Sequence, residues 1–150
     1  MSVRLSQRIV IAEKHQSDEL DVFVNAALGR KSGRLVILDL RQISPVADYF
    51  IICSAKSTRQ AGAIADHIRS EVRKTGRRTI GIDGLNESQW VLLDYGSVMV
   101  HIFYEPVRDF YDLEGLWIDA PRIETDAMVK AALKGDESLK KDTGDNGDDW

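Results

Sequence analysis

Trp90-Val-Leu-Leu-Asp-Tyr-Gly-Ser-Val-Met-Val-His-Ile-Phe103 is the most informative part of this chain, because two apolar runs meet there at a glycine turn. Residues 91–95 and 98–103 are typical of two strands, and the spacing at Gly96-Ser97 predicts a tight antiparallel hairpin. Pro106 follows and suits the first turn of a helix, which we expect to run to about Trp117. The sequence therefore predicts a strand–strand–helix unit here.

The chain before this unit supplies further helices and strands. Ser17 is predicted to cap a helix that ends near Gly29, and Ser57 is predicted to cap a second helix that ends at Gly76. Three more segments are typical of strands, namely residues 35–40, 49–54 and 78–83. This order of elements predicts a single α/β domain that has a mixed sheet of about five strands and flanking helices.

The two ends of the chain differ in composition from the middle. We interpret residues 1–17 as an N-terminal extension and residues 18–120 as the folded domain. Pro121 interrupts the pattern, and a short helix is expected within residues 121–134. Residues 135–150 are polar and rich in Asp and Gly, so we predict an acidic disordered tail.

The net charge of −4 is located in that tail. Residues 135–150 hold six of the 24 acidic residues and two of the 20 basic residues, so the rest of the chain is formally neutral. A neutral body argues against nucleic-acid binding driven by broad charge neutralisation. No apolar run approaches the roughly 20 residues that span a bilayer, and a single cysteine, Cys53, excludes an intramolecular disulfide. We therefore expect a protein of a reducing compartment that does not enter membranes.

The helix of the strand–strand–helix unit has an apolar arc that is wider than one contact with a sheet requires. At about 100° per residue, Phe110, Leu113 and Trp117 share a face. Glu114 falls inside the arc, where an unpaired carboxylate is costly. Glu114 should therefore meet a cation such as Arg108, or lie at a contact made only in an assembly. The mixture of large aromatics and charge favours a protein-binding surface over a plain core helix.

Three polar or aromatic residues of the hairpin are candidates for a structural or a functional role. His101 is favoured as a structural histidine over a catalytic or metal-binding one, because no partners at triad or ligand spacing surround it; a histidine that lines a binding surface is also compatible. Trp90 either anchors its loop to the core or is an exposed hot spot. Asp94, just before Tyr95-Gly96, is expected to organise the turn.

An enzyme and an RNA-binding protein are the alternatives that the residues leave open. Asp109 and Asp112 follow the hairpin at a suggestive distance, but two-metal nucleotidyl transfer needs carboxylates that converge from a strand, and these two fall in a helical stretch. The basic residues at the end of the second predicted helix complement the helix dipole and are candidates for an auxiliary RNA contact; they are Arg69, Arg73, Lys74, Arg77 and Arg78. The sequence carries no phosphate loop, catalytic triad or metal-ligand set, so neither a cofactor nor a metal is expected.

Several ordered motifs make the chain resemble the ribosomal silencing factor family, RsfS, also called Iojap. The likeness covers roughly residues 18–120 and is carried by Asp39-Leu-Arg41, Asp48-Tyr-Phe-Ile-Ile52, Ser57-Thr-Arg-Gln60, Val100-His-Ile-Phe103 and residues 90–96 and 108–117. The resemblance implies an α/β fold related to nucleotidyltransferases but without their catalytic residues, usually as a cytoplasmic homodimer. The family commonly has Gly-Asp where this chain has Gly96-Ser97, which removes a charge from the implied contact region.

The resemblance also implies a function. Members of the family bind ribosomal protein fourteen of the large subunit at the face that meets the small subunit, block subunit joining sterically and slow translation when nutrients are scarce. A non-enzymatic translation repressor is therefore expected, in which Trp90 and Tyr111 are apolar anchors while Asp94 and Glu114 pair with cations of the partner. The residues implied in the contact surface or its support are Trp90, Asp94, Gly96, His101, Tyr111, Leu113, Glu114 and Trp117.

Overall fold

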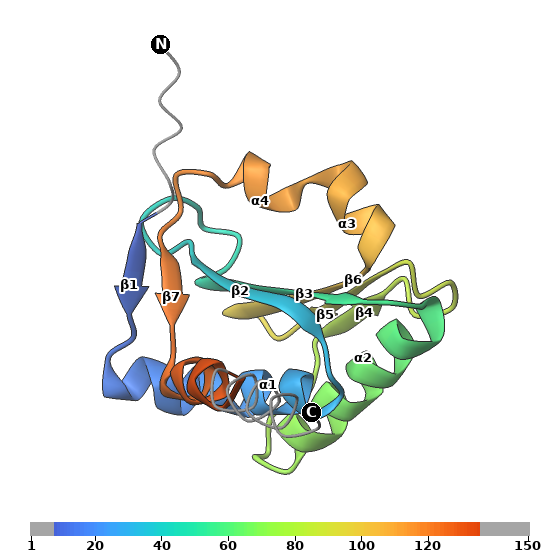
Figure 1. The fold of residues 1–150 in the computed structure, drawn as a ribbon, viewed down its shortest axis with the longest axis horizontal. Coiled ribbons are helices and arrows are strands. Elements are labelled where there is room, and N and C mark those ends of the chain that lie inside the picture. Colours follow the sequence, from blue (N-terminus) through green and yellow to red (C-terminus); the bar gives the residue numbers. More distant parts are fainter. Residues whose placement is uncertain (1–7, 136–150) are drawn as a thin grey trace, which may run out of the picture.

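A seven-stranded mixed sheet forms the centre of the computed structural model, which describes residues 8–135 (Figure 1). Its strand order is β1-β7-β2-β3-β6-β5-β4. The strands are β1 (Ile9–Ile11), β2 (Gly33–Asp39), β3 (Tyr49–Ala55), β4 (Gly81–Asp83), β5 (Trp90–Asp94), β6 (Val98–Tyr104) and β7 (Arg122–Glu124). The α/β class and the mixed sheet that the sequence predicts are both confirmed.

The two inner strands β3 and β6 run parallel and pair along their whole length, from Tyr49 opposite Val98 to Ala55 opposite Tyr104. Every residue of β3 is buried, which explains its continuous apolar sequence. Strand β5 pairs with β6 antiparallel, with Trp90 opposite Phe103, so the predicted hairpin is confirmed. This hairpin fixes which side chains of β5 and β6 share a face.

The prediction of about five strands is wrong, because β1 and β7 were missed. These two strands pair with each other in parallel, and β7 joins the main sheet through Leu38 opposite Arg122. Each has only three residues, which is too short for an alternating pattern to be recognised. Pro121 does not interrupt the fold, because its carbonyl accepts a hydrogen bond from the backbone N–H of Asp39 at 2.9 Å. The helix expected after Pro121 covers residues 126–135.

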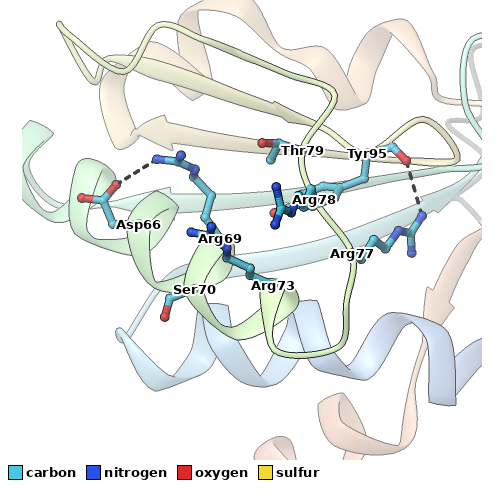
Figure 2. Close-up of a pocket in the computed structure, with 8 residues that line it drawn as sticks. All are labelled: Asp66, Arg69, Ser70, Arg73, Arg77, Arg78, Thr79 and Tyr95. Carbon is cyan, nitrogen blue, oxygen red and sulfur yellow. Dashed lines mark hydrogen bonds and ion pairs between the residues drawn. The ribbon is translucent and has the colours of Figure 1, made fainter.

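Helices cover both faces of the sheet (Figure 1). One face carries α1 (Lys14–Gly29) and α2 (Thr58–Arg73), and the other carries α3 (Glu105–Tyr111) and α4 (Leu113–Leu116). The apolar side chains accordingly form two separate cores, a larger one beneath α1 and α2 and a smaller one beneath α3 and α4. The arginines of the predicted basic cluster lie at the end of α2, on the side of the larger core (Figure 2).

The first helix starts four residues earlier than predicted. Glu13 is its N-cap, and the Glu13 backbone N–H donates to Oε1 of Gln16 at 2.9 Å, as in a capping box. Ser17, predicted as the cap, is instead a buried residue of α1, and its Oγ accepts a hydrogen bond from the backbone N–H of Asp126 at 3.2 Å. The predicted cap of α2 is confirmed, since Oγ of Ser57 accepts from the backbone N–H of Gln60 at 3.0 Å.

The single helix predicted from Pro106 to about Trp117 is in fact two. Asp112 adopts a left-handed conformation, with φ 47° and ψ 55°, and separates α3 from α4. Its backbone N–H still bonds to the carbonyl of Arg108, while its carboxylate accepts from the backbone N–H of Gly115 at 3.3 Å. Asp is one of the few residues besides Gly that visits this conformation, because its short side chain bonds locally.

Residues 1–7 and 136–150 lie outside the described part of the chain. They include the start of the predicted N-terminal extension and almost all of the predicted acidic tail. Within residues 8–135, no helix is both long and apolar enough to cross a membrane.

Candidate functional site

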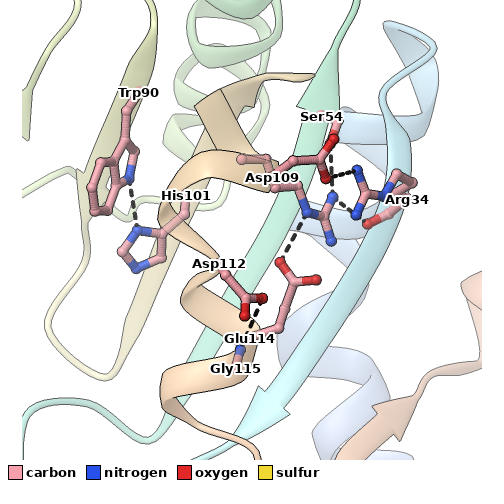
Figure 3. A network of polar contacts seen from close by, with 9 residues as sticks. Arg34, Ser54, Trp90, His101, Asp109, Asp112, Glu114 and Gly115 are labelled. Atoms are coloured by element: carbon pink, nitrogen blue, oxygen red, sulfur yellow. Dashed lines mark hydrogen bonds and ion pairs between the residues drawn. The ribbon is translucent and has the colours of Figure 1, made fainter. Parts of the chain in front are cut away.

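Trp90 is the centre of the predicted contact surface. It is the first residue of β5, is half-buried, and belongs to the edge of the smaller core. Its ring lies 4.8 Å from that of Phe103 and 5.0 Å from that of Tyr111, measured between centroids. Its indole Nε1 donates a hydrogen bond to Nδ1 of His101 at 3.1 Å (Figure 3). Trp90 therefore anchors its loop to the core, and part of its ring is exposed, while its role as a hot spot stays a prediction.

His101 is a buried, neutral histidine. Its side chain is 5% exposed and packs against Phe50, with ring centroids 4.5 Å apart. Burial lowers the pKa of His101 to about 4. Since Nδ1 accepts from Trp90, the ring proton sits on Nε2. This ring orients Trp90, in agreement with the structural role favoured by the sequence.

The aromatic contacts continue beyond His101. Phe50, on β3, also meets Trp117 in an edge-to-face contact with centroids 5.7 Å apart. Tyr111, Trp90, His101, Phe50 and Trp117 thus form one continuous row of ring contacts. Phe50 was missed by the sequence analysis, because it lies in an apolar run where nothing distinguishes it from an ordinary core residue.

Large apolar side chains are exposed along the outside of α3 and α4. Phe110 is 81% exposed, Tyr111 52% and Leu116 76%. Together with the half-buried Trp90 and Trp117, they form what we call the aromatic surface. Exposed apolar residues that are grouped in this way often mark an interaction site, whereas single exposed apolar residues are common on any protein surface.

The position of Phe110 corrects the prediction made from helical spacing. Phe110, Leu113 and Trp117 were expected to share one face, but the break at Asp112 rotates α4 relative to α3. As a result Leu113 is buried in the smaller core, while Phe110 points away from it and is exposed. Leu116, the last residue of α4, is exposed as well.

Arg108 holds the two short helices to the sheet. Its side chain is 1% exposed, and its Nε donates to Oε1 of Glu114 at 2.9 Å. Its Nη1 donates to Oγ of Ser54 at 2.8 Å and to the carbonyl of Arg34 at 2.7 Å. The predicted pairing of Glu114 with Arg108 is confirmed. Because Glu114 is already engaged inside the protein, it supports the aromatic surface from behind.

Asp94 and Gly96 lie apart from the other predicted site residues. Oδ1 of Asp94 accepts from the backbone N–H of Gly96 at 2.7 Å, so Asp94 organises the hairpin turn as expected. Gly96 has a φ of 84°, which favours glycine. Asp94 lies four positions after Trp90 along β5, which corresponds to roughly 13 Å. The structure therefore groups Trp90, His101, Tyr111, Leu113, Glu114 and Trp117, and places Asp94 and Gly96 at the far end of β5.

Comparisons with known proteins identify the family of this chain. Residues 13–149 match the family model described as ribosomal silencing factor during starvation. The chain belongs to the ribosomal silencing factor family. The RsfS of Bacillus subtilis is 38% identical over 112 residues, covering 75% of this chain and 95% of that protein. The RsfS of Halalkalibacterium halodurans is 36% identical, covering 73% and 94%. A crystal structure of a Bacillus halodurans protein has a TM-score of 0.64 at 34% identity and covers 71% of this chain and 97% of that one.

In this member of the ribosomal silencing factor family, the two carboxylates considered for two-metal chemistry have other partners. Asp109 pairs with Nη1 of Arg34 at 2.8 Å on the surface (Figure 3). Asp112 caps α4 through the backbone N–H of Gly115. Across residues 8–135, no group of three His, Cys, Asp or Glu side chains is placed to hold a metal ion. Asp109 and Asp112 therefore each have a partner within the protein.

Proposed function

We propose that this chain binds the large ribosomal subunit through ribosomal protein fourteen and sterically blocks joining of the small subunit. The observation that carries the proposal is the aromatic surface, in which Phe110, Tyr111 and Leu116 are exposed beside half-buried Trp90. Family membership supports the ribosome as the target. On this proposal the factor acts in the cytoplasm, without a cofactor and without catalysis.

The chemistry of the surface suits a protein partner. Tyr and Trp are the residues that most often dominate the energetics of protein interfaces, because they bury a large area at a small entropic cost. Binding to ribosomal RNA alone would need a strong excess of positive charge, whereas the chain outside residues 135–150 is formally neutral. A protein on the subunit face is therefore the better fit.

The aromatic surface is held rigidly, which favours tight binding. The buried Arg108 joins α3 and α4 to β3 and β2 through Ser54 and the carbonyl of Arg34. The Trp90 indole is fixed by its hydrogen bond to His101. Surface side chains that are already ordered lose less conformational entropy on binding. We therefore expect Trp90 and Tyr111 to contribute most to affinity.

We further propose that the free protein is a homodimer. Its edge strand β1 supports this proposal, because Ile9 and Ile11 are 61% and 65% exposed and exposed edges readily pair with another chain. Sedimentation equilibrium over a range of protein concentrations tests it. A monomer at all concentrations would contradict it.

Co-sedimentation with isolated ribosomal subunits tests the proposed function. The protein should pellet with the large subunit and not with the small one, and addition of the missing subunit should then yield fewer joined ribosomes. Trp90→Ala and Tyr111→Ala should each weaken binding by more than about 1 kcal/mol while the domain stays folded. Binding without any block of joining would favour an assembly factor.

A matched pair of leucine variants shows whether the aromatic surface is the contact. Leu116→Ala removes a 76% exposed side chain from this surface, and Leu133→Ala removes a 59% exposed one from the helix at residues 126–135. Only Leu116→Ala should weaken large-subunit binding. Equal effects of the two changes would move the contact elsewhere.

A further inference from the structure

A second surface feature lies on the opposite side of the sheet from the aromatic surface. It is a pocket of about 450 Å³ at the C-terminal end of α2, next to the segment that leads into β4 (Figure 2). Four arginines line it, namely Arg69, Arg73, Arg77 and Arg78. We call this the arginine pocket. A partner seated on α3 and α4 would leave it open, so it is independent of the proposed subunit contact.

The positive charge of the arginine pocket is only weakly compensated within the described residues. Arg69 pairs with Asp66 at 3.7 Å and Arg77 pairs with Glu19 at the same distance, both longer than a direct hydrogen bond. Arg73 and Arg78 are exposed and form no ion pair with any residue in the part of the chain that the structure covers. The pocket therefore presents an excess of guanidinium donors.

Arg77 is fixed in place before any ligand arrives. Its Nη2 donates to Oγ of Ser97 at 2.7 Å, and its guanidinium lies over the rings of Phe23 and Tyr95, 5.6 and 5.8 Å from their centroids. Figure 2 shows this guanidinium turned toward the Tyr95 carbonyl, which accepts from Nη2 at 3.5 Å, so Arg77 orders the wall of the pocket.

Like charges gathered in one pocket repel one another, and a bound anion would relieve this repulsion. Guanidinium groups match phosphate oxygens with paired hydrogen bonds, and they do so better than ammonium groups. The hydroxyls of Ser70 and Thr79 in the pocket wall offer further donors. The donor set is therefore that of a phosphate site.

The surroundings of the arginine pocket favour a compact ligand over a nucleic-acid strand. Asp66 on its wall and Glu71 and Asp94 in neighbouring segments carry negative charge. An RNA backbone needs a basic stripe that follows several phosphates, and it would meet these carboxylates on leaving the pocket. A short chain of adjacent phosphates would place all its charge among the arginines.

We propose that the arginine pocket binds a compact anion with two or more adjacent phosphates, such as the diphosphate or triphosphate chain of a nucleotide. The guanidiniums of Arg69, Arg73 and Arg78 hold the phosphate oxygens, and Arg77 orders the wall beside them. The auxiliary contact with ribosomal RNA expected from the sequence is the competing interpretation of the same residues.

Calorimetric titration of the full chain at constant ionic strength tests the proposal. The ligands are inorganic phosphate, pyrophosphate, tripolyphosphate and a nucleoside triphosphate, with the unphosphorylated nucleoside as a negative control. Affinity should rise from phosphate to tripolyphosphate. A saturating ligand should also raise the melting temperature by roughly 3–6 °C at about ten times Kd.

Two charge-matched double variants locate the site. Arg73→Glu with Arg78→Glu should lower the affinity for tripolyphosphate about tenfold or more. Arg30→Glu with Arg59→Glu makes the same change in net charge at exposed positions outside the pocket and should leave affinity within about twofold. Arg73→Gln with Arg78→Gln is a milder pocket variant, which keeps the test valid if the first one fails to fold.

Three results would overturn the proposal: absence of binding, equal losses in the pocket and control variants, or tighter binding of a short single-stranded RNA than of tripolyphosphate. The last result would assign the arginines to RNA. None of these measurements uses ribosomal subunits, so their outcome does not depend on the proposed silencing function.

Discussion

Arg108 and Glu114 form a nearly buried ion pair across the break between α3 and α4, with Nε and Oε1 2.9 Å apart. Their side chains are 1% and 15% exposed, whereas Arg34 and Asp109, paired nearby at 2.8 Å, are 45% and 63% exposed. The two pairs have similar distances and different burial, which makes them a matched comparison.

Loss of the buried pair should cost far more stability than loss of the exposed one. Glu114→Ala leaves the Arg108 charge buried without its partner, so we expect the free energy of unfolding to fall by about 3 kcal/mol or more. Asp109→Ala should lower it by less than about 1 kcal/mol. Urea unfolding of both variants gives the two values. Similar losses would show that burial does not set the strength of the Arg108 pair.

The stability of the protein should depend on pH through His101. Burial lowers the pKa of His101 to about 4 in the folded chain, compared with about 6.5 when unfolded. As pH falls, His101 is therefore protonated in the unfolded state before it is protonated in the folded state. This difference favours the unfolded state, so the free energy of unfolding decreases as pH falls from about 6.5 to about 4. The loss should reach roughly 3 kcal/mol.

His101→Asn is the reference for this pH effect, because asparagine does not titrate and can accept a hydrogen bond from the Trp90 indole. The difference in unfolding free energy between the native chain and this variant should shrink steadily below about pH 6.5. Other groups cancel in the difference. A difference that is constant with pH would contradict the buried, neutral histidine.

Gly84 should tolerate no side chain. Its φ is 80°, and a Cβ there would collide with the backbone carbonyl of Trp90. Gly84→Ala should therefore destabilise the domain by about 2–4 kcal/mol and also weaken large-subunit binding, because Trp90 must move. Gly81→Ala, in β4, meets no atom within 4 Å and should stay within about 0.5 kcal/mol. Unfolding and co-sedimentation measure both variants. Equal behaviour would remove the steric explanation.

Cys53 should be unreactive in the folded protein. It is fully buried in β3, and burial raises the pKa of its thiol to about 12. A thiol reagent at pH 8 should modify it only in denaturant, because thiolate and access are both lacking in the native state. Absorbance during labelling follows the reaction. Rapid labelling of the native chain would show that β3 opens readily.

Much of the fold is predictable from local pattern. The hairpin at Gly96-Ser97, the helix cap at Ser57 and the pairing of Glu114 with Arg108 all follow from rules that act over a few residues. Trp90, Tyr111 and Trp117 were chosen through the family resemblance, and the structure brings them to one surface. Whether that surface binds ribosomal protein fourteen stays a prediction.

The misses arise where distant segments determine local structure. Strands of three residues such as β1 exist only because another strand lies beside them. Ser17 looks like a cap but is used by the distant backbone of Asp126. The break at Asp112 depends on one residue entering a rare conformation, which helical periodicity cannot reveal. That break also explains why Phe110, which was expected on the same face as Leu113, is exposed.

The parallel pairing of β1 with β7 makes the first strand within residues 8–135 depend on the last one there. A nascent chain that has reached Tyr104 already contains the five strands β2 to β6, which can assemble into a continuous sheet. Ile9–Ile11 must wait, with its apolar residues unpaired, until Arg122–Glu124 has been synthesised. A truncation just before Arg122 would therefore remove β7 and leave β1 without its pairing partner, so this edge of the sheet closes only after residues 122–124 have been synthesised.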